Sequence, residues 1–492
     1  MFKLSPFLLG VGAAALLAGT AMAKDDLIVA IQLEPPHLDP TSAAAGAIDS
    51  VLYANVFEGL TRFDSAGAVI PGLAKSWEIS DDGLTYTFTL NGGVTFHDGT
   101  TMDAEDVKFS LDRIGADDSA NAQKALYASI SEVNVIDPAT VEVKLSEPNG
   151  MMLFNLAWGD AVIVAPESIE NIKQTPIGTG AFKFDSWTQG DKIEISRYDE
   201  YWGTPAVLTK ATFKFISDPT AALGAMMAED IDVFAGFPAP ENLPQFEADP
   251  RFQVLVGSTE GETILSTNNK VAPFDNVKVR EALAHAIDRQ AIIDGAMFGY
   301  GTPIGTHFAP HNPAYVDLTG MSAYDPEKAR ALLAEAGFAD GFETTLFLPP
   351  PSYARRGGEI IAAQLAEVGI KAEITNVEWA QWLESVFNGK NFGLTIVSHT
   401  EPMDIAIYAN PDYYFQYDNP AFQDLMATLN TTTDPDTRTT MLGDAQKIIS
   451  EDYVNGYLFQ LAALSVAKAG VHGLWANQPT QATDLTAVSW AE

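Results

Sequence analysis

The chain has 492 residues, with 65 acidic and 28 basic side chains, a formal net charge of −37 at pH 7 and no cysteine. So acidic a chain repels nucleic-acid phosphates and anionic membranes, and it has no thiol for disulfides, thiolate metal sites or cysteine nucleophiles. Its length exceeds what one hydrophobic core serves, so two or three domains are expected.

The N-terminus is typical of a secretory signal peptide. Lys3 supplies a short positive region, residues 7–17 form an apolar run, and Ala21-Met22-Ala23 matches a cleavage site. We expect cleavage after Ala23 and export of the mature chain. No later stretch reaches the length of a membrane span.

Strand patterns dominate the first half of the chain. Apolar and polar residues alternate with period two in segments 84–90, 140–145 and 192–198. Each of these segments is predicted to be a strand with one buried face.

Helix patterns dominate the second half. An apolar stripe runs through 275–294, which predicts one helix capped by Asp275 or Asn276. The segment 325–337 has a cap at its start and glycine at its end, and a further helix is expected to end at Gly369 before a strand. Alternating helices and strands predict an α/β fold.

Motifs for catalysis or cofactor binding are missing from the sequence. It contains no phosphate-binding loop, dinucleotide fingerprint, zinc-protease helix or nucleophile elbow. His307 and His311 are four residues apart, but Pro310 and Pro313 argue against a helix that would place both on one face. No metal site and no cofactor are therefore predicted.

The segment Ser398–Tyr408, SHTEPMDIAIY, gathers His399, Glu401 and Asp404. It could be a catalytic pair of carboxylates, a metal site, an anchor for a cationic ligand, or an ordinary loop of an acidic protein. A hydrolytic pair needs a defined separation between its carboxylates, and an irregular loop imposes none.

Seven segments in series resemble the periplasmic dipeptide- and oligopeptide-binding proteins of ABC importers, which form family 5 of the solute-binding proteins. These segments are EPPHLDP (34–40), VFEGLTRFD (56–64), PGLAKSWEISDDGLTYTFTLNGGVTFHDG (71–99), MDAEDVKFSLDRI (102–114), PIGTGAFKFDSWTQGDKIEISRYDEYWG (176–203), PFDNVKVREALAHAIDRQAII (273–293) and YDPEKARALLAEAGF (324–338).

The resemblance implies an α/β periplasmic-binding-protein architecture. Two lobes are joined by two crossing segments and enclose the ligand, and the first lobe carries an extra subdomain. After the signal peptide (1–23), the implied division is 24–56, 178–265 and 467–492 for the main part of lobe one, 57–177 for the extra subdomain, and 266–466 for lobe two.

The resemblance also implies a function. We expect a monomeric periplasmic binding protein, not an enzyme, that captures a peptide or similar small zwitterion and delivers it to an ABC permease in the inner membrane. The alternative is the same transport role for a metal chelate, an opine or a sugar.

Two family positions that contact the ligand have a match in this sequence. Arg355 or Arg356, in the motif ARR, matches an arginine that holds the ligand carboxylate, which a guanidinium can bind through two hydrogen bonds. Trp379 matches an aromatic residue that lines the pocket.

A family aspartate that binds the ligand α-amino group has no clear counterpart here. His399 stands where tryptophan is usual, and Glu401 aligns with the aspartate after a one-residue deletion, whereas Asp404 or Ser398 requires other gaps. We expect Glu401 to anchor a cationic group. Asp404 is expected to be structural, capping the next turn through local backbone bonds.

Overall fold

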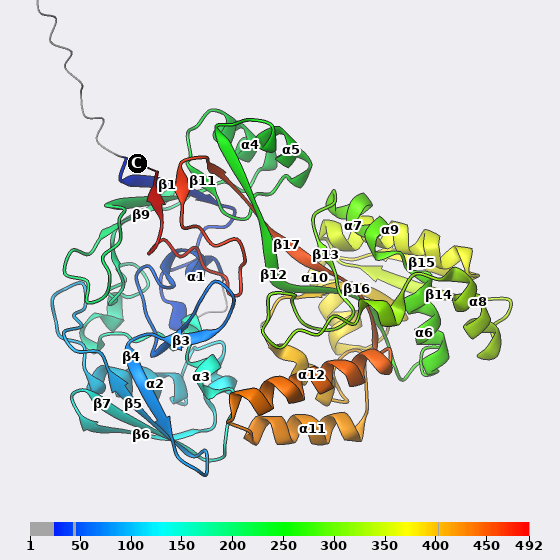
Figure 1. Ribbon diagram of the computed structural model, residues 1–492, viewed down its shortest axis with the longest axis horizontal. Coiled ribbons are helices and arrows are strands. Elements are labelled where there is room, and N and C mark those ends of the chain that lie inside the picture. The colour runs from blue at the N-terminus through cyan, green and yellow to red at the C-terminus, as the bar shows by residue number, and fades with distance from the viewer. Residues whose placement is uncertain (1–23, 43–45, 402, 492) are drawn as a thin grey trace, which may run out of the picture.

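The computed structural model in Figure 1 describes residues 24–42, 46–401 and 403–491. The predicted signal peptide, residues 1–23, lies outside the described residues. Within them, the chain forms two lobes of mixed strands and helices (Figure 1). Of the described helices, none has both the length and the apolar character needed to cross a membrane.

One mixed sheet of eleven strands runs through both lobes. Its order is β8-β9-β10-β1-β11-β17-β12-β16-β14-β15, and β13 pairs with β17. The strand bounds are β1 (Asp26–Ile31), β8 (Phe182–Thr188), β9 (Lys192–Arg197), β10 (Lys210–Phe215), β11 (Val233–Phe234), β12 (Phe252–Thr267), β13 (Thr302–Pro303), β14 (Phe342–Leu348), β15 (Ile370–Asn376), β16 (Leu394–His399) and β17 (Asn455–Lys468).

Strands β12 and β17 connect the lobes. They are antiparallel neighbours of 16 and 14 residues: β12 runs from the first lobe into the second, and β17 returns from the second lobe to the first (Figure 1). Their register shifts between Ser258 and Glu262. This irregularity takes residues 259–261 out of regular pairing and leaves them at the boundary between the lobes.

The two larger hydrophobic clusters of the first lobe lie around β1, β9 and β10 and against the four-stranded sheet β4-β5-β7-β6. The remaining elements are α1 (Gly46–Leu52), β2 (Thr61–Phe63), β3 (Val69–Pro71), β4 (Ala74–Ile79), β5 (Thr85–Leu90), α2 (Ala104–Gly115), β6 (Ile130–Asp137), β7 (Thr140–Leu145), α3 (Met152–Asn155), α4 (Pro219–Met227), α5 (Leu243–Glu247), β18 (Val471–His472) and β19 (Ser489–Trp490).

A buried carboxylate links two of the segments quoted from the sequence. Glu58 accepts hydrogen bonds from Thr179 Oγ1 (2.9 Å), Tyr201 OH (2.8 Å) and Trp202 Nε1 (2.9 Å). Burial raises the pKa of Glu58, while the three donors oppose that rise. The bonds tie residues 56–64 to residues 176–203.

The second lobe packs helices against its part of the main sheet. They are α6 (Val277–Ala286), α7 (Arg289–Met297), α8 (Pro326–Glu335), α9 (Ser352–Glu367), α10 (Trp379–Trp382), α11 (Pro420–Thr431) and α12 (Pro435–Glu451). The caps expected for α8 are present, because Asp325 accepts from Lys328 N at 2.9 Å and Gly337 has φ +92°.

The single helix expected over 275–294 is wrong. The chain turns extended at Ile287, and the Asp288 side chain caps a new helix by accepting from Ala291 N at 3.1 Å. The apolar stripe continues across the break because both helices pack on the same core. The strands expected over 84–90, 140–145 and 192–198 are present as β5, β7 and β9. The residue limits of the predicted lobes and subdomain stay a prediction.

Candidate ligand site between the lobes

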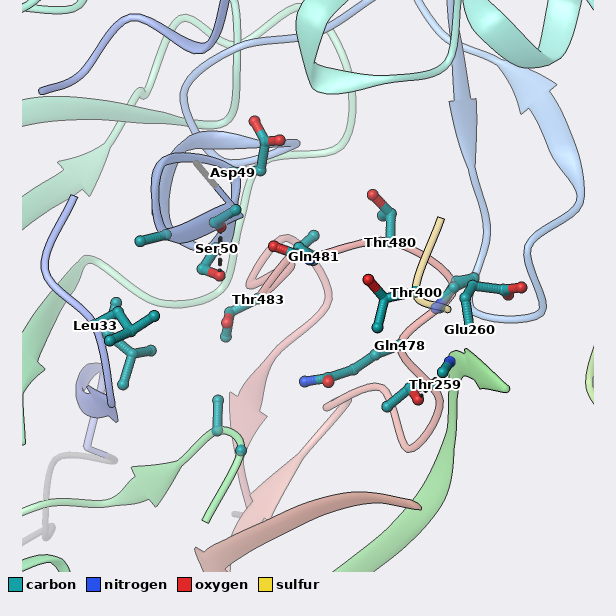
Figure 2. A pocket seen from close by; sticks show the side chains of 18 of the residues that line it. Leu33, Asp49, Ser50, Thr259, Glu260, Thr400, Gln478, Thr480, Gln481 and Thr483 are labelled. Carbon is teal, nitrogen blue, oxygen red and sulfur yellow. Dashed lines mark hydrogen bonds between the residues drawn. The ribbon is translucent and has the colours of Figure 1, made fainter. Parts of the chain in front are cut away.

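A cavity of about 460 Å³ lies where the two lobes face each other. Figure 2 shows its walls: α1 with Asp49 and Ser50 on one side, the segment 478–483 beside it, and Glu260 of β12 with Thr400 opposite. Pockets for small molecules are commonly 300–1,000 Å³. This volume suits a ligand of a few residues or a small metabolite.

The cavity is lined by four carboxylates. They belong to Asp49, Asp160, Glu260 and Glu401, and the described lining contains no lysine or arginine. One oxygen each of Asp49, Asp160 and Glu260 is buried and has no hydrogen-bond partner among the described residues. A buried charge without a partner costs free energy, so a hydrogen-bond donor or a cation beside these oxygens would stabilise them.

The pKa values of two of these acids reflect that cost. Burial raises the pKa of Asp160 to about 7. Burial, and then the charge of Asp160, raises the pKa of Asp49 well above its ordinary value. Near neutral pH the pair therefore holds less negative charge than two free aspartates would, until a cation arrives.

Local structure sets the positions of these acids. Asp49 lies on α1 and packs against Gly159, where an added Cβ would come within 2.3 Å of Asp49 Oδ1. Asp160 follows directly, in a short 3-10 turn over Gly159–Ala161. Glu260 lies in the irregular stretch of β12, and its other oxygen is in hydrogen-bonding contact with His311 Nε2. The glycine leaves room for the Asp49 carboxylate beside the turn that carries Asp160.

Uncharged polar groups complete the lining. Figure 2 labels the hydroxyl and amide side chains that surround the cavity, which are Ser50, Thr259, Thr400, Gln478, Thr480, Gln481 and Thr483. Trp158 also lines it, and its Nε1 is buried without an acceptor. These groups offer hydrogen bonds to the uncharged polar parts of a ligand.

Some residues of the segment Ser398–Tyr408 line the cavity, and others lie in the protein interior. Glu401 is exposed and lines the cavity, and one of its oxygens accepts from Thr400 N at 3.1 Å. His399 and Asp404 do not line it. Instead, Asp404 lies 2.7 Å from His307 Nε2 and 3.4 Å from His399 Nδ1.

The local capping role expected for Asp404 is wrong. The 3-10 helix that begins at Asp404 (η8, Asp404–Ala409) has no side-chain cap bond. Burial alone would raise the pKa of this carboxyl, but the adjacent His307 and His399 outweigh burial and hold it below its usual range. The carboxylate is thus ionised and engaged with two imidazoles.

The predicted arginines and tryptophan lie outside the cavity lining. Arg355 pairs with Glu378 at 3.0 Å, and both side chains are substantially exposed. Arg356 stacks on the Phe298 ring at 5.2 Å. Trp379 is 41% exposed and touches the buried Trp382 edge-on. Their roles in ligand binding stay predictions that depend on movement of the lobes.

Sequence reasoning missed Asp49, Asp160 and Glu260. In a chain with 65 acidic residues, none of the three stands out by its neighbours. Only Gly159 beside Asp160 gives a local signal, since a glycine in a short turn favours close approach of another group. The fold brings these acids together from distant segments.

Comparison with known proteins gives consistent matches. A model of the family described as "Bacterial extracellular solute-binding proteins, family 5 Middle" matches residues 68–417. The glutathione-binding protein GsiB of Salmonella typhimurium (strain LT2) is 33% identical over 462 residues, or 89% of each chain.

Two solved structures superpose over nearly the whole molecule. HbpA2 from Haemophilus parasuis has a TM-score of 0.87 and 26% identity, covering 95% of this chain and 100% of that one. AgaA of A. tumefaciens R10, in complex with agropinic acid, has a TM-score of 0.75 and 26% identity, covering 95% and 99%. These superpositions confirm the predicted α/β fold class with two lobes.

Proposed function

Because the chain belongs to family 5 of the bacterial extracellular solute-binding proteins, we propose that its acidic cavity binds the cationic group of a peptide or similar small zwitterion. The protein is a periplasmic solute-binding protein of an ABC importer, as the family match and the relatives show. The proposal concerns its ligand and the residues that hold it.

The unpartnered carboxylate oxygens of Asp49, Asp160 and Glu260 carry the proposal. Closure of two lobes on a ligand removes water, and a ligand ammonium then needs carboxylate partners. Glu401 reaches the same cavity from the second lobe. A cation bound between Glu401 and the acids of the first lobe would hold the lobes together.

A peptide-like ligand agrees with the relative GsiB, which is named for binding glutathione. A zwitterion also carries a carboxylate, for which the described lining offers no basic side chain. Arg355 is the candidate, because its pair with Glu378 is exposed and weak, and its Nε is buried without a partner. The guanidinium of Arg356 instead lies over the ring of Phe298.

A non-peptide ligand is the second candidate. AgaA was solved with agropinic acid, and the hydroxyl and amide lining of this cavity would also suit an opine, a sugar or a metal chelate. These ligands differ in charge, so the acidic lining should bind those with a cationic group more tightly than those without one. A ligand without a cationic group would leave the carboxylates of Asp49 and Asp160 unpaired.

We also propose that the chain has no hydrolytic activity. The relatives are binding proteins. An acid/base pair of Glu401 and Asp404 would need both carboxylates to face one substrate, whereas only Glu401 lines the cavity and Asp404 is held by two histidines.

Cleavage after Ala23 and a monomeric mature chain complete the proposal, and intact mass and light scattering test these two points.

A thermal-shift screen of the mature protein tests the ligand class. The panel contains di- and tripeptides, opines, sugars and nickel chelates. A ligand at about 1,000 times its dissociation constant adds roughly 4 kcal/mol of stability. We expect the largest rise in melting temperature from zwitterionic peptides. A rise only with sugars or anionic opines would overturn the proposal.

A further inference from the structure

A buried cluster behind the cavity wall has no place in the ligand site described above. His307 Nε2, His399 Nδ1 and the carboxylate of Asp404 converge, with their ligand atoms within 4.8 Å of one another. The side chains of His307, His399 and Asp404 are 0%, 7% and 15% exposed. Two imidazole nitrogens and a carboxylate form a donor set that divalent transition metals accept.

The outer nitrogens of both histidines are held as they are in metal sites. His307 Nδ1 lies 3.1 Å from Tyr408 OH, and His399 Nε2 lies 3.2 Å from Tyr414 OH. Both tyrosines are buried. Histidines that bind metals almost always hydrogen-bond through the second ring nitrogen, which orients the ring and sets the tautomer. A tyrosine hydroxyl can accept that N–H.

A second, independent observation is the excess of carboxylate around the cluster. Glu262 lies directly opposite His399 in the pairing of β12 with β16, and its Oε2 is buried without a partner. Within the described residues, no lysine or arginine pairs with Asp404, Glu260 or Glu262.

We propose that His307, His399 and Asp404 bind one divalent transition-metal ion, with Glu262 available as a further ligand. Tetrahedral ligand atoms about 2.0–2.2 Å from zinc lie about 3.3–3.6 Å apart. The separations of Asp404 oxygens from His307 Nε2 and His399 Nδ1 are 2.7 and 3.4 Å, so small side-chain shifts suffice. The ion would lock Thr400 and Glu401, which follow His399, against β12. Its role is structural, and the inference does not rest on which ligand the cavity binds.

The test uses the full mature chain without a polyhistidine tag, because such a tag binds the same metals. Protein stripped with EDTA and dialysed is titrated with Zn²⁺ at pH 7.5 by calorimetry, and with Co²⁺ by visible absorption. We expect one ion per chain and a Co²⁺ d–d spectrum of low coordination number. Zn²⁺ should raise the melting temperature of the stripped protein.

Variants locate the ion. Asp404→Asn and His399→Gln should each weaken Zn²⁺ binding at least about 100-fold, because loss of outer partners alone costs 10–100-fold. Tyr414→Phe, which removes only such a partner, should weaken it about tenfold. His472→Gln is the matched control, since His472 is exposed and remote from the cluster in the fold. Circular dichroism in EDTA checks that each variant folds.

Three outcomes would overturn the proposal. The first is wild-type protein that binds no stoichiometric ion, which would make the cluster a hydrogen-bonded His–Asp–His network. The second is Zn²⁺ binding that Asp404→Asn and Tyr414→Phe leave unchanged. The third is binding that appears only when free L-histidine is added, which would assign the ion to a chelate ligand. If Asp404→Asn and His399→Gln do not fold, the wild-type stoichiometry, the Co²⁺ spectrum and Tyr414→Phe decide.

Discussion

Asp404 Oδ1 lies 2.7 Å from Nε2 of His307, although the two residues are 97 positions apart in the chain. This contact joins η8 to the irregular segment before α8, and it is buried. Asp404→Ala would leave His307 and His399 without their shared acceptor. Breaking a buried pair costs about 3 kcal/mol or more. We expect that loss in urea unfolding of ligand-free protein in EDTA, with ligand affinity mostly retained.

Glu401→Gln should behave in the opposite way. Its side chain is exposed, so the free energy of unfolding without ligand should stay the same or rise. When the lobes close on a ligand cation, losing one partner of a buried charge pair costs about 2–5 kcal/mol. We expect at least about 30-fold weaker binding by calorimetry. If Asp404→Ala loses affinity and Glu401→Gln does not, the anchor is Asp404.

Arg355→Ala and Arg356→Ala separate the two arginines of α9. If Arg355 leaves Glu378 to bind the ligand carboxylate, Arg355→Ala should weaken binding about 30-fold or more. Arg356→Ala is the control, because this guanidinium lies over Phe298. Calorimetry with one zwitterionic peptide compares them. Wild-type affinity in both variants would show that the ligand carboxylate binds elsewhere.

Affinity for a cationic ligand should rise with pH between about 5.5 and 8. Asp160 has a pKa of about 7 in the folded protein, so it is mostly neutral at the lower pH and ionised at the higher. If only the ionised form binds the cation, affinity changes by roughly tenfold or more across this range. Asp160→Asn should flatten the profile measured by calorimetry.

The free energy of unfolding of the protein without ligand should change with pH in the opposite direction and fall as pH rises. A carboxyl with a raised folded-state pKa favours the folded state while protonated, and this contribution is lost as pH rises from about 4 through about 7. Asp49 acts in the same direction, since burial and Asp160 raise its pKa. A peptide affinity that falls as pH rises would contradict the role given to Asp160.

The sequence was sufficient where structural signals are local. Asp325, Pro326 and Gly337 mark the ends of α8 within a dozen residues, and alternation marks β5 and β7. The break at Ile287 was not predictable from periodicity, because α6 and α7 share one apolar core and the stripe continues across the break. The two-lobe architecture came from the family resemblance, since strand pairing between distant segments leaves no periodic trace.

The site was predicted only in part for the same reason. Glu401 was identified by its place in a family segment, and it does line the cavity. His307 and His311 lie four residues apart in the sequence, but their imidazoles contact different carboxylates, those of Asp404 and Glu260. Asp49 and Asp160 meet through the packing of α1 against the turn at Gly159, which is a tertiary contact.

The acidic cavity is proposed to select a ligand by its cationic group. The most direct measurement is native mass spectrometry of the mature protein after incubation with an equimolar mixture of dipeptides, and separately with the same mixture after N-acetylation. Acetylation converts the ammonium into an uncharged amide that carries an added acetyl group, and it leaves the C-terminal carboxylate unchanged. We expect bound dipeptides from the free mixture and none from the acetylated one. Equal retention from both mixtures, or retention of acetylated peptides alone, would contradict it.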